Sequence, residues 1–280
     1  MSAVRLTTRS VEKVWGRYQL GFGFADVPAD GNPVGEIWFE TPDRAAPDLL
    51  VKYLFTSEKL SVQVHPDDAQ ARAGGHARGK EECWLILEAE PDAEIGIGLV
   101  EPMETEALRA AAIDGSIERK LAWTPVTPGD LFYLPAGTIH AIGAGVTLLE
   151  VQQNIDLTYR LYDYGRPRDL HLDDAVAVAT RAPWQPPDAP GEIAPGRAIL
   201  AAGRAFVLER WTGDRTARLG QPEPGPLWLI PLDGSGTIDD APLEPGGVWL
   251  ADDAADLDYS GTLLAAYPGG AVAPDLIRPT

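Results

Sequence analysis

The sequence predicts a mainly β protein made of two related β domains. Short apolar segments alternate along the chain with turns rich in glycine and proline, of which there are 29 and 25, a pattern typical of sandwiches and barrels. One strand-like motif also recurs, because Pro128-Gly129-Asp130-Leu131-Phe132-Tyr133 is echoed by Pro245-Gly246-Gly247-Val248-Trp249-Leu250. A chain of 280 residues can bury one large core or two modest ones without disulfides.

The expected strands are short apolar runs bounded by turn-forming residues. In chain order they span Leu49–Phe55, Leu60–His65, Glu82–Leu87, Ile95–Leu99, Leu131–Leu134, Thr147–Gln152, Arg204–Glu209, Leu227–Pro231 and Gly247–Leu250. Apolar residues at helical spacing predict one helical insertion at Thr105–Lys120. A second short helix is expected at His171–Thr180, where two aspartates suit the first turn.

A proline-rich segment without periodicity, Arg181–Arg197, separates the two blocks of strands. We therefore expect a first domain over residues 1–185, with the helical insertion near 105–120, and a second β domain over residues 186–280. The second block contains no histidine. It is thus expected to be a degenerate copy that lacks a metal site, which leaves the metal-binding and catalytic role to the first domain.

Charge and composition exclude several classes of partner. The chain has 23 Lys and Arg against 42 Asp and Glu, a formal net charge of −19, which disfavours nucleic acid and anionic membranes. No apolar run approaches the roughly 20 residues that span a bilayer. The single cysteine, Cys83, and the charges within Met1–Leu20 favour a cytoplasmic protein without a secretory signal. The sequence does not indicate an oligomeric state.

The segment Leu60–Asp68 carries the first candidate site residues. Side chains alternate along a strand, so Leu60, Val62 and Val64 point to one face, and Ser61, Gln63 and His65 point to the other. This polar row lines a cavity or a solvent-exposed face, and the segment alone does not distinguish the two. Glu82 opens the next apolar run and could face the same cavity. Cys83 would then face the core as a small apolar residue.

The spacing of Gly129, Pro135, Gly137 and His140 matches the second sequence motif of the cupin superfamily. The first cupin motif is met only in part, because Gln63 stands where histidine is usual and a loop, Asp67–Lys80, follows. Nitrogen and oxygen donors without a thiolate suit a divalent ion that keeps positions open for water or substrate. The ligand set expected on this basis is Gln63, His65, Glu82 and His140.

Within the cupins, the chain resembles the class I mannose-6-phosphate isomerases in their short bacterial form. The resemblance covers Val11 to about Asp174 and rests on Lys13-Val14-Trp15-Gly16, Gly35-Glu36-Ile37-Trp38, Leu50–Leu54, Ser61–Asp68, Gly79–Trp84 and Asp156–Arg160. It implies two cupin-like (jelly-roll) β-barrels and one zinc ion held by residues corresponding to Gln63, His65, Glu82 and His140. It also implies conversion of a small sugar phosphate, mannose 6-phosphate, to fructose 6-phosphate through an enediol.

That reaction needs an electrophile for the carbonyl, a base for the carbon-bound proton and a cationic grip on the phosphate. Arg160 matches the family arginine beside the reacting end of the sugar, and Lys80 lies two residues before Glu82. Lys52 and Ser61 are candidates for substrate or phosphate contact. Glu150 and Asp156 are candidates for proton transfer, and the sequence does not rank them.

Two other functions fit the same residues. A cupin isomerase for another sugar phosphate, such as glucose 6-phosphate, would share the fold. A non-catalytic sugar-phosphate-binding protein would need neither the full ligand set nor Arg160. The remaining histidines, His76 and His171, lie in weaker contexts and are not assigned to the site.

Overall fold

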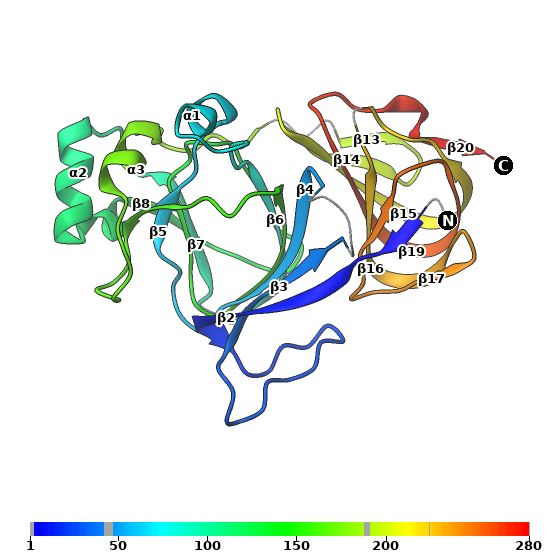
Figure 1. Ribbon diagram of the computed structural model, residues 1–280, viewed down its shortest axis with the longest axis horizontal. Coiled ribbons are helices and arrows are strands. Elements are labelled where there is room, and N and C mark those ends of the chain that lie inside the picture. The colour runs from blue at the N-terminus through cyan, green and yellow to red at the C-terminus, as the bar shows by residue number, and fades with distance from the viewer. Residues whose placement is uncertain (1–2, 42–46, 188–190, 224, 280) are drawn as a thin grey trace.

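Antiparallel β-sheets form both lobes of the computed structural model (Figure 1), which describes residues 3–41, 47–187, 191–223 and 225–279. Its strands are arranged in three sheets, of nine, six and five strands. The expectation of a mainly β protein is therefore confirmed.

The six-stranded sheet lies at the centre of the fold. Its strands follow the order β2-β3-β4-β11-β6-β9. Their bounds are β2 Thr7–Arg17, β3 Val34–Glu40, β4 Leu49–Phe55, β6 Glu82–Ala89, β9 Leu131–Leu134 and β11 Val146–Gln153.

The five-stranded sheet packs against one face of the central sheet. Its order is β12-β5-β10-β7-β8. The strands are β5 Val62–Val64, β7 Glu94–Leu99, β8 Leu121–Pro125, β10 His140–Ile142 and β12 Tyr159–Tyr162.

The nine-stranded sheet forms the second lobe, where both chain ends lie (Figure 1). Its main path is β1-β18-β16-β19-β15-β14-β13, with β17 paired to β16 and β20 to β15. The bounds are β1 Ala3–Arg5, β13 Gly191–Ala194, β14 Arg197–Ala202, β15 Phe206–Leu219, β16 Leu227–Ile238, β17 Ala241–Leu243, β18 Trp249–Ala251, β19 Ala255–Pro268 and β20 Ile277–Pro279. Because β1 pairs with β18, the start of the described chain joins this sheet. The division into domains at residues 185 and 186 stays a prediction.

Alternation along the central strands buries both faces of the six-stranded sheet. On one face, Val51 and Tyr53 share a core with Phe206 and Trp228 of the nine-stranded sheet. On the other face, Leu54, Trp84 and Ile86 share a core with Ile95 and Ile97 of the five-stranded sheet. Successive residues of one strand therefore belong to different cores. The second of these faces also carries the site described below.

Short helices cover part of the first lobe, with α2 and α3 at its outer end (Figure 1). They are α1 Asp68–Ala73, α2 Thr105–Asp114, α3 Leu172–Val178 and the 3-10 turn η1 Ser116–Lys120, and a second 3-10 turn, η2 Pro274–Leu276, lies near the end of the chain. The predicted helix Thr105–Lys120 is divided because Gly115, with φ of 77°, ends α2. In the described part of the chain, no helix is long and apolar enough to cross a membrane.

Several predicted elements differ from those observed. The predicted strand Leu60–His65 is shortened to β5, and Leu60 packs in a different core from Val62 and Val64. The predicted loop Asp67–Lys80 contains α1, which the Asp67 carboxylate caps by accepting from the Gln70 N–H.

The predicted strand Arg204–Glu209 enters the longer strand β15 only from Phe206, because Arg204 and Ala205 lie in a turn, and the predicted strand Leu227–Pro231 forms part of the longer strand β16. These strands continue through polar residues to Leu219 and Ile238. The extension is possible because their backbones pair with β19 along most of its length. The apolar pattern marks only the portion of each strand whose side chains are mostly buried.

One buried ion pair ties together the second lobe. Glu209 is fully buried, and its carboxylate accepts from Arg197 at 2.7 and 2.8 Å. The Trp211 indole and the Tyr267 hydroxyl donate to the same carboxylate at 2.7 and 2.6 Å. Hydrogen bonds from Arg197, Trp211 and Tyr267 therefore all converge on the single Glu209 carboxylate.

We expect Glu209→Ala to lower the free energy of unfolding by about 3–5 kcal/mol, because it leaves the buried Arg197 without its charge partner. Denaturant unfolding measures the change. Arg218→Ala is the control, since Arg218 and Asp256 form an exposed pair whose loss should cost no more than about 1 kcal/mol. Equal losses in the two variants would contradict the expectation.

Candidate active site and metal centre

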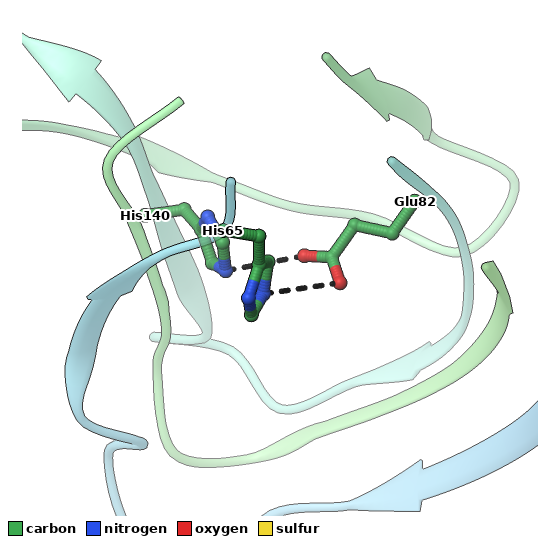
Figure 2. A group of neighbouring side chains, drawn as sticks. All are labelled: His65, Glu82 and His140. Carbon is green, nitrogen blue, oxygen red and sulfur yellow. Dashed lines mark ion pairs between the residues drawn. The ribbon is translucent and has the colours of Figure 1, made fainter. Parts of the chain in front are cut away.

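Two facing sheets bring together three potential metal ligands. His140 is the first residue of β10 and pairs directly with Gln63 of β5 in the five-stranded sheet, and His65 follows β5. Glu82 is the first residue of β6 in the six-stranded sheet. One ligand atom from each of His65, Glu82 and His140 lies within 4.8 Å of the other two. All three residues are buried, and both imidazole rings face the carboxylate (Figure 2).

Backbone carbonyls fix which nitrogen of each ring carries a hydrogen. His65 Nδ1 lies 2.8 Å from the Leu157 carbonyl oxygen, and His140 Nδ1 lies 2.8 Å from that of Thr138. A carbonyl oxygen only accepts, so each Nδ1 donates and each Nε2 of a neutral ring presents a lone pair. The two Nε2 atoms are the ones that face Glu82. Ligating histidines commonly have this arrangement.

Burial keeps both rings neutral. It lowers the pKa of His65 to about 3, with a further contribution from the nearby Lys80 ammonium, and it also lowers the pKa of His140. Glu82 Oε1 lies 3.1 Å from His140 Nε2, and this buried oxygen has no hydrogen-bond donor. Two electron-rich atoms at that distance repel each other unless a cation lies beside them. The arrangement therefore fits a bound metal ion.

Glu82 is ionised despite its burial. Burial alone would raise the pKa of this carboxyl, but the Lys80 ammonium holds the pKa well below its usual value. Lys80 Nζ lies 2.8 Å from Glu82 Oε2 and 3.3 Å from His65 Nε2. An anionic ligand and two neutral imidazoles are thus present together, as a divalent ion requires.

Gln63 adds an amide beside this group. Its Nε2 lies 3.2 Å from His140 Nε2, and its Oε1 accepts from the Ser61 hydroxyl at 3.1 Å. The amide oxygen is the atom that would bind a metal, and a half-turn of the amide would exchange the two ends while Ser61 accepts instead. Cys83 points to the opposite face and packs in the core shared with the nine-stranded sheet. The prediction of Cys83 as a core residue is confirmed.

A cavity lies beside the candidate metal site, between the two sheets of the first lobe. Eight of the ten predicted site residues line it, and the other two, His65 and His140, each contact Glu82, which lies on its wall. The eight residues are Lys52, Ser61, Gln63, Lys80, Glu82, Glu150, Asp156 and Arg160. Asp156 is exposed at the cavity, whereas Glu150 is buried.

Charges of opposite sign alternate along one side of the cavity. In spatial order, this charge row consists of Lys13, Glu36, Lys52, Glu150, Lys80 and Glu82. The successive nitrogen-to-oxygen distances are 3.2, 3.9, 3.8, 3.4 and 2.8 Å. Each inner member of the row therefore has a neighbour of opposite charge on both sides.

Burial raises the pKa of Glu150, and the neighbouring cations Lys52 and Lys80 offset this effect only in part. For Lys80, burial acts in the opposite direction, but Glu150 and Glu82 outweigh it and raise the pKa of the ammonium. Lys80 therefore stays protonated. Glu150 is the group in this pair that can gain and lose a proton.

Arg160 differs from the cations of the charge row. It makes no ion pair with any residue that the structure describes, and its buried Nε has no hydrogen-bond partner. An unpaired guanidinium at the cavity wall is available to an anionic ligand.

Sequence reasoning did not assign five of the charged or aromatic residues at the cavity. These are Lys13, Trp15, Glu36, Trp84 and Arg168. The first four lie in motifs that carried the family resemblance, so alternation along those segments could have indicated them. Arg168 has no such signal, because it pairs with Asp163 at 2.6 Å in an irregular segment after β12.

Neither of the histidines left out of the site joins the ligand group. His76 is exposed after α1. His171 precedes α3, where its Nδ1 accepts from the backbone N–H of Arg160 at 3.3 Å.

A search of protein-family models finds no match. The chain is 31% identical over 279 residues to the mannose-6-phosphate isomerase of Streptococcus mutans, an alignment that covers 83% of this chain and 85% of the relative. It is 44% identical over 137 residues to the mannose-6-phosphate isomerase ManA of Bacillus subtilis, covering 46% and 43% of the two chains. A crystal structure of the mannose 6-phosphate isomerase from Bacillus subtilis superposes with a TM-score of 0.81 at 29% identity, and the match covers 95% of this chain and all of that one.

We expect the purified chain to bind one divalent metal ion, measured by elemental analysis after dialysis. His140→Ala should weaken binding by more than roughly 100-fold, because loss of a ligand exceeds the effect of losing a ligand's hydrogen-bond partner. His76→Ala, which removes an exposed imidazole, serves as the control and should bind normally. Unchanged metal content in the His140 variant would contradict the assignment.

Proposed function

The chain belongs to the mannose-6-phosphate isomerase family, and on that premise we propose that it interconverts mannose 6-phosphate and fructose 6-phosphate through an enediol intermediate. The observation that carries this proposal is the position of a buried group that can bind a metal beside a cavity lined by Arg160, Lys80 and Glu150. Proton transfer between adjacent sugar carbons requires these three kinds of group close together.

The proposed metal is zinc, held by Gln63, His65, Glu82 and His140. Imidazole and carboxylate donors without a thiolate suit this borderline ion when a coordination position stays open for substrate. When bound, the ion would supply a Lewis acid that polarises the sugar carbonyl.

We propose Glu150 as the carboxylate that moves the carbon-bound proton. Its pKa is raised by burial, which brings a carboxylate closer to the range in which a base is effective at neutral pH. Asp156 also lines the cavity but is exposed. Its proposed role is to exchange protons with the sugar hydroxyls at the open side.

Arg160 and Lys80 are proposed to stabilise the negative charge that develops on the enediolate. Arg160 has no carboxylate partner among the described residues, so its charge can act on the substrate without first breaking an ion pair. Lys80 is held protonated between Glu150 and Glu82, which favours a role as a fixed cation rather than a base.

Lys52 and Ser61 are proposed to contact the substrate from the cavity wall. The Ser61 hydroxyl also holds Gln63, and Lys52 Nζ lies 3.8 Å from Glu150. Both residues therefore connect substrate binding to groups already assigned to the reaction. The proposed partner is a small anionic sugar phosphate, which the cavity cations attract locally despite the net charge of −19.

The same proposal includes a cupin-like fold of two jelly-roll barrels, one for each lobe, as in the family that the sequence resembles. The facing five-stranded and six-stranded antiparallel sheets support it. A cytoplasmic location, expected from the single cysteine, is proposed on the same grounds.

The test is conversion of mannose 6-phosphate to fructose 6-phosphate by the purified protein, followed in a coupled assay. We expect turnover that chelation abolishes and zinc restores. Arg160→Ala should lower kcat by a factor on the order of 10² to 10³, because it removes a charge that faces the developing oxyanion.

Arg218→Ala is the matched control, since Arg218 lies in an exposed ion pair of the second lobe. Binding of mannose 6-phosphate without turnover by zinc-loaded protein would favour a non-catalytic binding protein. Turnover of glucose 6-phosphate in its place would overturn the substrate assignment.

A pH profile tests the role of Glu150. A base must be ionised, so kcat/KM should fall as the pH drops through the raised pKa of Glu150. Lys52→Met removes one of the two cations that oppose this rise, and the acidic limb should therefore move to higher pH. In the control, Lys59→Met, the limb should not move, because Lys59 pairs with Glu94 and Glu118 away from the cavity. A limb that stays in place in Lys52→Met would exclude Glu150 as the base.

A further inference from the structure

Glu81 lies between two residues of the site and points away from them. Lys80 and Glu82 both line the cavity, and alternation turns the side chain between them to the opposite face. Glu81 is 8% exposed and has no ion pair with any residue in the described part of the chain. This buried carboxylate has no place in the proposed reaction.

The Glu81 carboxylate is held by neutral donors. The Tyr133 hydroxyl donates to Oε2, and the backbone N–H of Ala205 donates to the same oxygen at 3.3 Å. Tyr133 belongs to β9 and is buried, with its ring 5.3 Å from that of Phe206 in β15. Through these contacts, the start of the strand that carries Glu82 is joined to the nine-stranded sheet.

The turn that carries Ala205 is shaped to receive Tyr133. It connects β14 to β15 and is closed by the Gly203 N–H, which donates to the Phe206 carbonyl at 3.0 Å. A Cβ atom on Gly203 would lie 1.5 Å from the tyrosine hydroxyl oxygen. Only glycine therefore lets the turn approach so closely.

The Glu81 backbone is fixed from the other side. Its N–H donates to the Gln153 side-chain oxygen at 3.0 Å, and its carbonyl accepts from the Gln153 backbone N–H at 3.1 Å. Gln153 ends β11 of the central sheet. The central sheet thus holds the backbone of Glu81, while Tyr133 of β9 and Ala205 of the second lobe together hold its side chain.

Stability alone does not account for this group. A buried carboxylate without a cationic partner lowers stability relative to a well-packed apolar side chain. The contacts instead restrict the direction in which the strand enters the site. Hydrogen-bond partners behind a ligand commonly affect metal affinity in this way.

We propose that Glu81, Tyr133 and the turn Gly203–Ala205 form a latch by which the second lobe positions Lys80 and Glu82. Glu81 is a positioning residue in this proposal, because it touches neither metal nor substrate. This proposal rests on the proposed function, because its effect is measured as metal binding at the proposed site. It means that the second lobe, which contains no histidine, nevertheless affects that site.

The experiment measures zinc affinity of the folded full-length chain by competition with a fluorescent chelator, alongside isomerase activity. Tyr133→Phe removes only the hydroxyl that donates to Glu81. We expect it to raise the zinc dissociation constant on the order of 10-fold and to lower kcat.

Tyr267→Phe is the matched control, because it also removes a tyrosine hydroxyl that donates to a buried glutamate, but inside the second lobe. It should lower stability and leave zinc affinity within about twofold of the parent. Equal loss of zinc affinity in Tyr133→Phe and Tyr267→Phe would mean that the effect follows from lost stability alone. That result would overturn the latch.

A second pair of variants separates hydrogen bonding from charge. Glu81→Gln keeps an oxygen for both donors and should bind zinc within about threefold of the parent, whereas Glu81→Ala should bind as weakly as Tyr133→Phe. Equal weakening in Glu81→Gln and Glu81→Ala would overturn the proposal.

Failure of the proposed function would look different. The zinc-loaded parent would then not isomerise mannose 6-phosphate, while the order of zinc affinities among the variants would still hold.

Discussion

The pairing of buried charges in the charge row is the constraint on which the site depends. Each ion in the row has lost most of its water, and an isolated buried carboxylate or ammonium would change protonation state instead of staying charged. The alternation of positive and negative charges keeps Glu82 ionised, because the pKa of its carboxyl stays low beside Lys80. It prevents the outcome less completely for Glu150, whose pKa is raised by burial. One row of charges therefore yields both a permanent anion for a metal and a carboxylate suited to proton transfer.

Strand register builds this row. Lys52 lies directly opposite Glu150 in β4 and β11, and Trp38 of β3 lies opposite Lys52. The Trp38 ring lies under the Lys52 ammonium at 4.4 Å, and its indole donates to Glu36. Because three ammonium groups balance three carboxylates, the row adds no net charge to the cavity. A divalent ion and the unpaired Arg160 would then make the cavity positive within an acidic protein, which favours an anionic substrate.

The sequence predicted those parts of the site that depend on local alternation and motif spacing. The bounds of Leu49–Phe55 and Leu131–Leu134 agree with β4 and β9, and eight predicted residues reach one cavity. The strands β2 and β3 were not predicted, because their polar residues on one face conceal the apolar pattern of the other. The contact between Glu81 and Ala205 could not be predicted either. It joins residues 124 positions apart, and local patterns contain no information about such pairs.

The same alternation explains why a histidine-free lobe is needed beside the site. Four strands that present a charge to the cavity, β3, β4, β6 and β11, present apolar side chains such as Val51 and Tyr53 to the opposite face. Those side chains would be exposed to water if the nine-stranded sheet did not cover them with Phe206, Trp228 and Ile230. Paired ions contribute little net stability when buried, so the apolar side chains on this second face supply stability that the charge row does not. The second lobe therefore supports the first through burial, without contributing a residue to the cavity wall.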